Sequence, residues 1–466
     1  MKRALLISTY DLGHQPFGLA SPAAWLRREG VDVRCADLSK EKLADASATE
    51  ADLIAFHLPM HTATRLAAPV IRKVRELNPA ARLCAYGLYA PLNEDWLRSL
   101  GVDDVLGGEF EADLAALVHG LPTTGCATSD LKVRAGGASS VPKLHFITPD
   151  RSGLLPLNRY ATIHLGDGRR RVAGYTEASR GCRHLCRHCP VVPIYNGQFR
   201  IVQQDVVLAD IAAQVAGGAE HITFGDPDFF NGPTHAVRIV EAIHQLYPSL
   251  SYDVTIKVEH LLRHVDLLPR LRDTGCLFVT TAVESLDDRV LKILEKGHTR
   301  ADFIAAVDRC REAGLTLMPT FVAFHPWISL AGYCDLLDTI ATLDLVDHVA
   351  PIQLAIRLLI PRGSRLLELA EVRTLANTFD PKTLSFLWSH PDPDVDALQH
   401  DVAAIVGKRL TSNRQEAFAA ISALAHTRAG IARAPQPFSN GSKSVPYVDE
   451  PWYCCAEPNP EQLTLV

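Results

Sequence analysis

The chain has 466 residues, of which 47% are hydrophobic and 21% are charged, and its formal net charge is −6. This length is enough for two or three domains, and the composition is that of an ordinary water-soluble protein. Lys and Arg are scattered along the chain, which argues against nucleic acid as a partner, and no apolar run is long enough to span a membrane. The first apolar run ends at Tyr10-Asp11, too early for a signal peptide, so we expect a cytoplasmic protein with reduced thiols.

Residues 1–121 alternate short predicted strands with predicted helices. The strands are expected at Ala4–Thr9, Val31–Asp37, Leu53–His57, Ala81–Tyr86 and Val102–Leu106. The helices are expected at Ala20–Arg28, Thr64–Leu77, Asn93–Leu100 and Glu111–Leu117. This alternation predicts a doubly wound, Rossmann-like α/β domain, with any ligand at the carboxyl ends of the strands.

Residues 122–160 are rich in Thr, Gly, Ser and Pro, which predicts a linker that lies between two domains. Strand and helix then alternate again over residues 161–370, at a longer period. Strands are expected at Gly174–Ala178, Ile222–Phe224, Tyr252–Lys257, Phe278–Ala282, Thr316–Phe321 and Ile352–Leu358. Helices are expected at Val206–Val215, His235–Leu246, Leu261–Arg272, Asp287–Leu294, Arg300–Ala313 and Leu330–Leu343. Six such units predict a partial (β/α)6 barrel with its chemistry at the carboxyl ends of the strands.

The last hundred residues are predicted to form a helical region and a tail. Residues 371–432 are expected to be helical, in Val372–Leu387 with a break at Pro381 and in Val395–Gly430. Residues 433–466 are rich in Pro, Ser, Gly and Asn, which is typical of a flexible tail.

The eleven cysteines fall into two groups. Six are isolated in the sequence and are predicted to be small buried hydrophobic residues: Cys35, Cys84, Cys126, Cys276, Cys310 and Cys334. The other five form a triplet, Cys182, Cys186 and Cys189, and a pair, Cys454-Cys455. These two clusters are the candidates for chemistry.

The triplet has the spacing C-x3-C-x2-C on a turn bounded by Gly181 and Pro190. Three thiolates can bind three irons of a four-iron cluster and leave the fourth iron an open position, which catalysis at a metal requires. Zinc is the alternative, because His184 and His188 lie between the cysteines and could complete a closed Cys3His site. The absence of a second cysteine pair in the barrel region favours the iron–sulfur cluster over zinc.

The motif and its setting after the first predicted barrel strand resemble the radical SAM superfamily. That resemblance implies a [4Fe–4S] cluster held by the triplet, with S-adenosylmethionine on the open iron. It also implies S-adenosylmethionine contacts from Gly225 and Asp226 after the second strand, from Glu284 after the fourth and from Arg357 in the sixth. Glu284 has a structural alternative, a salt bridge with Lys257 or Arg357. His188 stands where most family members have an aromatic residue, which an imidazole can replace while also tuning the cluster by hydrogen bonding.

The pair Cys454-Cys455 lies in the segment Trp452–Pro458, which reads WYCCAEP. Two adjacent thiolates suit a soft ion such as arsenic(III), zinc or copper(I), although an ordinary exposed tail is the simpler explanation of the two cysteines alone. The whole segment resembles the CUAEP or CCAEP tail of one radical SAM group, in which selenocysteine can replace the second Cys. Members of that group are linked to organoarsenical (arsinothricin) biosynthesis, so the resemblance implies that Cys454 and Cys455 present arsenite for alkylation.

The N-terminal domain resembles the cobalamin-binding domains that precede many radical SAM enzymes. Its strand ends carry residues 11–18, His57 and residues 107–109, but the cobalt-binding pattern D-x-H-x-x-G is absent, because His14 follows Asp11 by three places rather than two. Cobalamin is therefore possible but not favoured. Taken singly, His14 and His57 are more simply explained as a polar loop residue or a hydrogen-bonded core histidine.

These features predict an enzyme that cleaves S-adenosylmethionine and transfers its 3-amino-3-carboxypropyl group to arsenite. The resemblance implies an electron donor such as flavodoxin or ferredoxin as partner. Two alternatives remain open at this stage. One is a cobalamin-dependent methyltransferase or a 5′-deoxyadenosyl-radical enzyme with a carbon substrate, and the other is a non-catalytic metalloid sensor.

Overall fold

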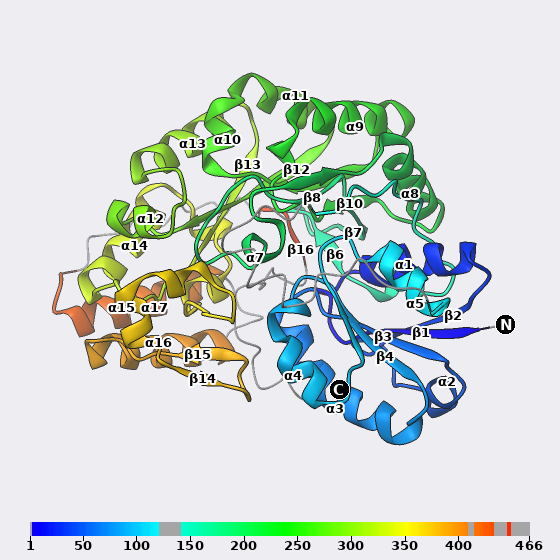
Figure 1. Ribbon diagram of the computed structural model, residues 1–466. Helices are drawn as coiled ribbons and strands as arrows, with labels where there is room; N and C mark the ends of the chain where they lie inside the picture. The colour runs from blue at the N-terminus through cyan, green and yellow to red at the C-terminus, as the bar shows by residue number, and fades with distance from the viewer. Residues whose placement is uncertain (1, 121–140, 409–413, 433–444, 449–466) are drawn as a thin grey trace.

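The computed structural model describes residues 2–120, 141–408, 414–432 and 445–448. An N-terminal α/β domain, a curled seven-stranded sheet covered by helices and a smaller C-terminal region pack around a common centre (Figure 1). Within the described residues, no helix has both the length and the apolar character needed to cross a membrane.

The N-terminal domain is a five-stranded parallel sheet in the order β2-β1-β3-β4-β5. Its strands are β1 (Arg3–Ser8), β2 (Asp32–Asp37), β3 (Leu53–His57), β4 (Arg82–Tyr86) and β5 (Asp104–Leu106). Its helices are α1 (Phe17–Arg28), α2 (Asp45–Thr49), α3 (His61–Leu77), α4 (Glu94–Ser99) and α5 (Glu111–Val118). The predicted doubly wound fold is confirmed, and the strand order reverses between β1 and β3, where such folds bind ligands.

The larger sheet has the order β13-β12-β11-β10-β7-β6-β16. Five neighbouring strands run parallel: β7 (Arg170–Thr176), β10 (His221–Phe224), β11 (Ser251–Thr255), β12 (Cys276–Glu284) and β13 (Thr316–Phe321). Strands β6 (Thr162–His164) and β16 (Tyr447–Val448) extend the β7 edge in antiparallel pairing. A short hairpin of β8 (Ser179–Gly181) and β9 (Phe199–Ile201), with helix α7 (Val192–Tyr195) between its strands, follows β7.

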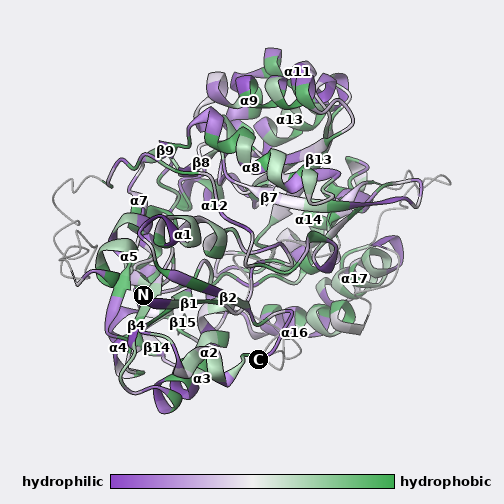
Figure 2. Ribbon diagram, turned by 90° about the vertical axis from the view of Figure 1, so that its right-hand side faces the viewer, coloured by the Kyte–Doolittle hydropathy of each residue, from purple (hydrophilic) through white to green (hydrophobic). Residues whose placement is uncertain are grey.

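Helices cover the outer face of this sheet: α8 (Gln204–Ala216), α9 (Pro233–Leu246), α10 (Val258–Arg263), α11 (Leu268–Asp273), α12 (Asp288–Ile293), α13 (Arg300–Glu312) and α14 (Leu330–Thr342). Figure 2 shows hydrophobic and hydrophilic residues mixed along these helices, as expected where one face packs on a sheet. Thr299 and Asp302 form a reciprocal capping box that fixes the start of α13. The predicted single helix Leu261–Arg272 is in fact two, α10 and α11.

The predicted sixth strand, Ile352–Leu358, is wrong. The chain forms a 3-10 turn at Pro351–Leu354 and makes one isolated bridge, between Phe324 and Arg357. The reason is a tertiary contact, because the side-chain oxygen of Gln353 accepts the backbone N–H of Phe321, 3.2 Å away, at the edge where the next strand would pair. The predicted partial barrel is thus confirmed as a fold, with five parallel strands in its sheet and the sixth position marked only by this parallel bridge.

The C-terminal region is only partly the helical unit expected. It contains α15 (Ala370–Leu375), α16 (Pro393–Lys408) and α17 (Arg414–Ala429), but residues 378–387 form a hairpin of β14 (Thr378–Asp380) and β15 (Ser385–Leu387). Pro381 lies in its turn, and Phe379 meets Phe386 edge to face across the strands at 5.2 Å. The predicted helix Val372–Leu387 is therefore wrong beyond α15.

The residues predicted to be linker and tail carry ordered contacts where they are described. Residues 141–160 pack between the domains: Arg151 pairs with Asp210 of α8 at 2.7 Å and also donates to the Gln15 side chain of the N-terminal domain. Residues 445–448 include β16, whereas the rest of the predicted flexible tail lies outside the described residues.

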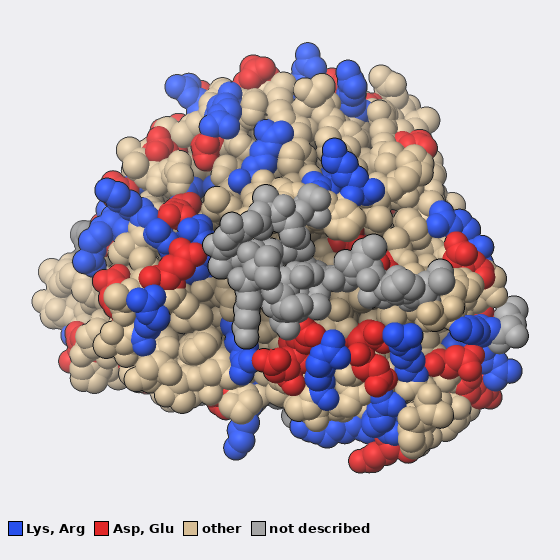
Figure 3. Space-filling model, in the orientation of Figure 1, with Lys and Arg blue, Asp and Glu red and all other residues tan. Residues whose placement is uncertain are grey.

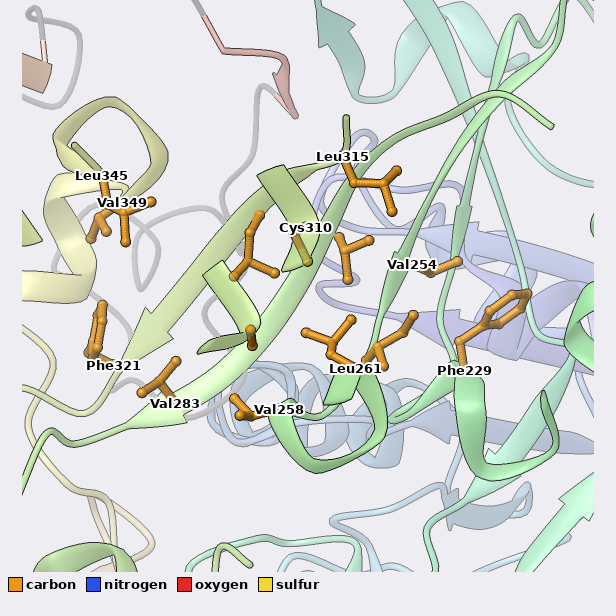
Figure 4. Packing of buried hydrophobic residues seen from close by; sticks show 14 of the residues in the cluster. Phe229, Val254, Val258, Leu261, Val283, Cys310, Leu315, Phe321, Leu345 and Val349 are labelled. Carbon is orange, nitrogen blue, oxygen red and sulfur yellow. The ribbon is translucent and has the colours of Figure 1, made fainter. Parts of the chain in front are cut away.

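The prediction that the isolated cysteines are buried is confirmed for four of the five that can be checked. Cys84, Cys276, Cys310 and Cys334 are buried and Cys35 is half-buried, whereas Cys126 lies outside the described residues. Figure 4 shows Cys310 among apolar side chains of the main core, which include Leu261, Leu315 and Phe321. Lys and Arg alternate with Asp and Glu over the face drawn in Figure 3, which agrees with the absence of a basic stripe in the sequence.

Candidate active site

The cysteine triplet lies on the loop between β8 and α7, at the carboxyl ends of the barrel strands, as predicted. Gly181 opens the loop with φ of +76°, and a Cβ there would lie 2.5 Å from the carbonyl oxygen of Gln198, so glycine is required. Asn231 fixes the other side, because its side-chain oxygen accepts the backbone N–H of Arg183 at 3.2 Å. Cys182 and Cys186 are buried and Cys189 is half-buried.

All three loop cysteines border one cavity of about 430 Å³, which lies between the two domains and extends into the barrel. The barrel wall of the cavity carries hydroxyl groups from neighbouring strands: Thr223, Thr255, Thr280 and Thr320. Its other wall is formed by strand ends of the N-terminal domain and includes His14 and His57. The cavity therefore joins the two places at which the sequence predicted ligands.

Two lysines lie beside the thiols: Lys257, considered from the sequence only as a partner of Glu284, and Lys296, which sequence reasoning missed. The Nζ atom of Lys257 is 3.9 Å from Sγ of Cys186, and burial lowers the pKa of this lysine while the Cys186 thiol opposes that shift. Burial would also lower the pKa of Lys296, but the Glu284 carboxylate and the thiols of Cys186 and Cys189 raise it instead. The positive charges of both lysines would offset the negative charge of thiolate ligands to iron.

Glu284 lies among these groups rather than in the salt bridges considered from the sequence. Its Oε1 atom is 3.3 Å from Nζ of Lys296 and 3.1 Å from Nε2 of His188. Burial would raise its pKa, but Lys296 and His188 lower it to about 2. Glu284 also has a φ of +72°, at the point where the register of β12 and β13 shifts. This rare backbone conformation directs an ionised carboxylate into the cavity.

The zinc alternative finds little support in this geometry. Among the described residues, the potential metal ligands whose atoms lie within 4.8 Å of one another are Cys182, His184 and Asp228, which are not a Cys3His set. Asp228 instead lies 2.7 Å from Nδ1 of His260 and 3.5 Å from Nε2 of His184. His188, the other histidine of the motif, is held by Glu284. The donor set that remains is three soft thiols around one cavity, which fits an iron–sulfur cluster.

Comparison with known proteins decides the assignment. Residues 176–326 match the model of the radical SAM superfamily. The chain contains a radical SAM domain. This match covers the cysteine loop and the parallel strands behind it, and it removes the non-catalytic sensor from the alternatives.

Relatives of this radical SAM enzyme include the hopanoid C-3 methylase of Methylococcus capsulatus, which is 24% identical over 69% of this chain and 64% of its own length. Another is the ribosomal protein uS12 methylthiotransferase RimO of Parabacteroides distasonis, 27% identical over 33% of this chain and 37% of that protein. The chain thus spans between about a third and two thirds of the length of these curated relatives.

Two solved structures of cobalamin-dependent enzymes share the fold. The radical S-adenosylmethionine methyltransferase TsrM from Kitasatospora setae, with tryptophan substrate and a SAM analogue bound, aligns over 87% of this chain and 89% of its own with a TM-score of 0.63 and 17% identity. The cobalamin-dependent enzyme OxsB, with aqua-cobalamin and S-adenosylmethionine bound, aligns over 92% of this chain and 72% of its own with a TM-score of 0.65 and 12% identity. The combination of a cobalamin-binding-like domain with a radical SAM barrel is therefore confirmed as a fold.

The structure brings together most of the residues predicted for S-adenosylmethionine. Gly225, Asp226 and Glu284 border the cavity with the three cysteines. Gly225 also has a packing role, since a Cβ at this position would lie 1.7 Å from the hydroxyl oxygen of Tyr175. Arg357 is not among the residues that border the cavity: it pairs with Asp396 at 2.6 Å and stacks on Trp388. The tail residues Cys454 and Cys455 lie outside the described residues.

Asp226 shapes the start of the cysteine loop. One of its carboxylate oxygens accepts the backbone N–H of Ala178 at 2.9 Å, and the other accepts the Ser179 hydroxyl at 2.5 Å. Burial raises its pKa to about 7 against these hydrogen bonds. Because the folded-state pKa is raised, the contribution of Asp226 to stability is fully present below about pH 4 and is lost as the pH rises through 7.

We expect Asp226→Asn to separate the two roles of this residue. The amide keeps one acceptor for the backbone N–H of Ala178 and removes the buried charge. The difference in melting temperature, variant minus wild type, should therefore be more positive at pH 8 than at pH 5. Affinity for S-adenosylmethionine should fall about tenfold or more if the carboxylate accepts the ligand's ammonium group. Thermal scans at both pH values and calorimetric titration measure the two effects, and unchanged affinity at pH 8 would remove Asp226 from the binding site.

A buried ion network joins the N-terminal domain to the cysteine loop. The Arg180 guanidinium, two residues before Cys182, contacts Glu109 at 3.0 Å, Glu111 at 2.7 Å and Glu177 at 2.6 Å. Burial raises the pKa of Glu109 to about 7, although Arg180 opposes the shift, and burial also raises the pKa of Glu177. The sequence had singled out Glu109 only as a strand-end residue, because its partner lies 71 residues away.

The N-terminal wall of the cavity has one feature that favours cobalamin binding and one that argues against it. The Nδ1 atoms of His14 and His57 are buried without a hydrogen-bond partner, so a ligand here could engage them. The His57 ring, however, lies directly against Gly18, where a Cβ would be 2.0 Å from its Cε1 atom, and burial lowers its pKa to about 3. This ring is packed as a neutral core imidazole. The wall thus fits a ligand by position, but no histidine occupies the place of the cobalt ligand in the D-x-H-x-x-G pattern.

Proposed function

We propose that this radical SAM enzyme transfers the 3-amino-3-carboxypropyl group of S-adenosylmethionine to trivalent arsenic. The observation that carries the proposal is that one cavity is bordered both by the three loop cysteines and by the last described residues before the cysteine pair. Cys182, Cys186 and Cys189 border it, and so do Tyr447 and Val448, of which Val448 lies six residues before Cys454 in the sequence. The resemblance of residues 452–458 to the CCAEP tail supports arsenic as the ion that the second pair binds.

The three loop cysteines would hold a [4Fe–4S] cluster, which when bound supplies the electron for reductive cleavage of S-adenosylmethionine. The chain's own groups do the rest. Lys257 and Lys296 offset the negative charge of the thiolates, and the ionised Glu284 offers an acceptor for hydroxyl or ammonium groups of the nucleoside or the amino acid. Gly225 and Asp226 form the adjoining wall. A small acidic electron carrier of the flavodoxin or ferredoxin class in the cytoplasm would supply the electron.

Arsenite enters this scheme as a neutral hydroxide. Cys454 and Cys455 would each displace one hydroxyl of As(OH)3, which releases two waters and leaves arsenic bound to two thiolates. The bond between sulfur and the γ-carbon of S-adenosylmethionine then breaks, a carbon–arsenic bond forms, and 5′-methylthioadenosine leaves. One electron would enter from the electron carrier at the cleavage, and the arsenic(IV) species formed by radical addition would return one electron to the oxidised carrier, so arsenic becomes pentavalent without a further oxidant.

The barrel interior supports a small polar substrate. Thr255 and Thr280 lie side by side in the register of β11 and β12, and Thr320 follows on β13, with all three side chains bordering the cavity. Tyr175 and Met318 are the larger neighbours in the same space. Hydroxyl groups of this kind suit As(OH)3 or a dithiolate-bound arsenic hydroxide better than a large apolar substrate.

A second candidate function is cobalamin-dependent methyl transfer. It is favoured by the cobalamin-dependent enzymes that share this fold and by the unpaired imidazole nitrogens of His14 and His57 on the cavity wall. Anaerobic titration with hydroxocobalamin tests it directly. A bound corrinoid with a shifted absorption spectrum would support this candidate, and free cobalamin that passes through a gel-filtration column apart from the protein would exclude it.

The product profile decides between the candidates. With reconstituted, reduced enzyme, S-adenosylmethionine and arsenite, we expect 5′-methylthioadenosine and an aminocarboxypropyl arsenical by mass spectrometry. The double variant Cys454→Ser/Cys455→Ser should lose arsenic alkylation by more than about 100-fold, because it lacks the soft ligands, while it still cleaves S-adenosylmethionine. 5′-Deoxyadenosine as the main product would contradict the proposal, as would undiminished alkylation by the double variant.

A further inference from the structure

Strand β16 is two residues long, yet it is held on both sides. Tyr447 pairs with His164 and Val448 with Ile163 of β6, and the rings of Tyr447 and His164 stack at 4.7 Å with an interplanar angle of 4°. The guanidinium of Arg414, at the start of α17, lies 4.8 Å from the Tyr447 ring centroid and donates to the carbonyl of Asp347. In Figure 1, β16 lies beside β6 near the centre of the molecule.

The direction of β16 follows from its pairing. Both β16 and β7 run antiparallel to β6, so β16 points the same way as β7. Val448 is level with Ile163 of β6 and hence with Arg171 of β7. Strand β7 ends at Thr176, shortly before the cysteine loop. The chain therefore leaves Val448 toward the same edge of the barrel that carries the cysteine loop.

The number of residues from Val448 to Cys454 is close to the number from Arg171 to the end of β7. From Arg171 to the end of β7 is five residues, and from Val448 to Cys454 is six. Six residues span at most about 20 Å, which is enough to reach the level of the loop. Tyr447 and Val448 already border the cavity that the three loop cysteines share.

We propose that β16 is a tether that holds the pair Cys454-Cys455 within reach of the cysteine loop, with Tyr447 as its positioning residue. This inference rests on the proposed function, in which the pair presents arsenic. Without the tether, the attachment point would be Ala432, 22 residues before Cys454 instead of six. Since effective concentration falls roughly as the −3/2 power of linker length, loss of the tether should lower it about sevenfold.

A matched pair of insertions tests the tether. Twelve Gly/Ser residues placed directly after Val448 lengthen the link to Cys454 threefold, whereas the same twelve residues placed after Ala432 leave that link unchanged. The first insertion should slow arsenic alkylation at subsaturating arsenite about fivefold, and the second should not slow it. Equal effects of the two insertions would overturn the tether.

A readout that does not depend on activity separates this inference from the proposed function. In cluster-free protein treated with the thiol oxidant diamide, two thiols give up two electrons and two protons to the reagent and form a disulfide between tail and loop cysteines. Peptide mapping should show this disulfide forming more slowly with the insertion after Val448 and with Tyr447→Ala, but not with Tyr447→Phe, which keeps the stacked ring. If disulfide formation follows this order while no arsenical is made, the tether stands and the proposed function fails. If all variants form the disulfide at the wild-type rate, the tether fails.

Discussion

Cys186→Ala is expected to abolish the iron–sulfur cluster and, with it, cleavage of S-adenosylmethionine. The Cys186 thiol lies 3.9 Å from Nζ of the buried Lys257 and is itself buried. Its loss removes one of three ligands, and since even outer partners of a metal site change activity by 10–100-fold, a ligand should cost more than about 100-fold. Iron and sulfide content after anaerobic reconstitution, the visible absorption of the cluster and the rate of S-adenosylmethionine cleavage measure the effect.

Cys334→Ala is the matched control for this prediction. Cys334 is equally buried but lies in α14, packed in the main core away from the cavity, and alanine is a good helix former. It should keep full iron content and activity. A Cys186→Ala protein that binds four irons and cleaves S-adenosylmethionine at the wild-type rate would show that the motif does not hold the cluster.

The parts of the fold that the sequence predicted well are those in which local pattern and tertiary burial agree. Strand β3 is buried at all five positions and is mostly apolar in sequence, so the predicted bounds, Leu53–His57, agree with the observed bounds at both ends. Gly181 and the cysteine spacing can likewise be recognised from the sequence alone, because the turn and the thiols lie close together in the chain. The same holds for Gly225 and Asp226, which directly follow a strand.

The failures occur where distant residues decide. The apolar run at residues 352–358 suits a strand, but the Gln353 side chain takes the N–H that would have extended the sheet. Lys296 and Glu284 meet across a bulge whose positive φ at Glu284 has no signature in a single sequence. Strand β16 is too short for any periodicity, and only its pairing with β6 reveals it. The cluster of three thiols was thus predictable from the sequence, whereas the charged side chains around it were not.

Arg180→Met is expected to unfold the interface between the two domains. It would leave the buried carboxylates of Glu109, Glu111 and Glu177 without the guanidinium that all three contact, while methionine still fills part of the space between Phe110 and Phe146. Removing one partner of a buried ion pair costs about 3–5 kcal/mol of folding free energy. The loss should grow with pH: burial already raises the pKa values of Glu109 and Glu177, and without Arg180 they rise further above the unfolded values, so stability is retained below about pH 4 and lost as the pH rises. Denaturant unfolding at pH 5.5 and pH 8 measures this loss of stability. Arg270→Met is the control, since Arg270 pairs with Glu241 at an exposed site where a salt bridge contributes about 0–1 kcal/mol.

Because Arg180 stands two residues before Cys182, the Arg180→Met variant should also take up cluster poorly at pH 8 and better at pH 5.5. A variant as stable as wild type at both pH values would show that the ion network does not join the domains.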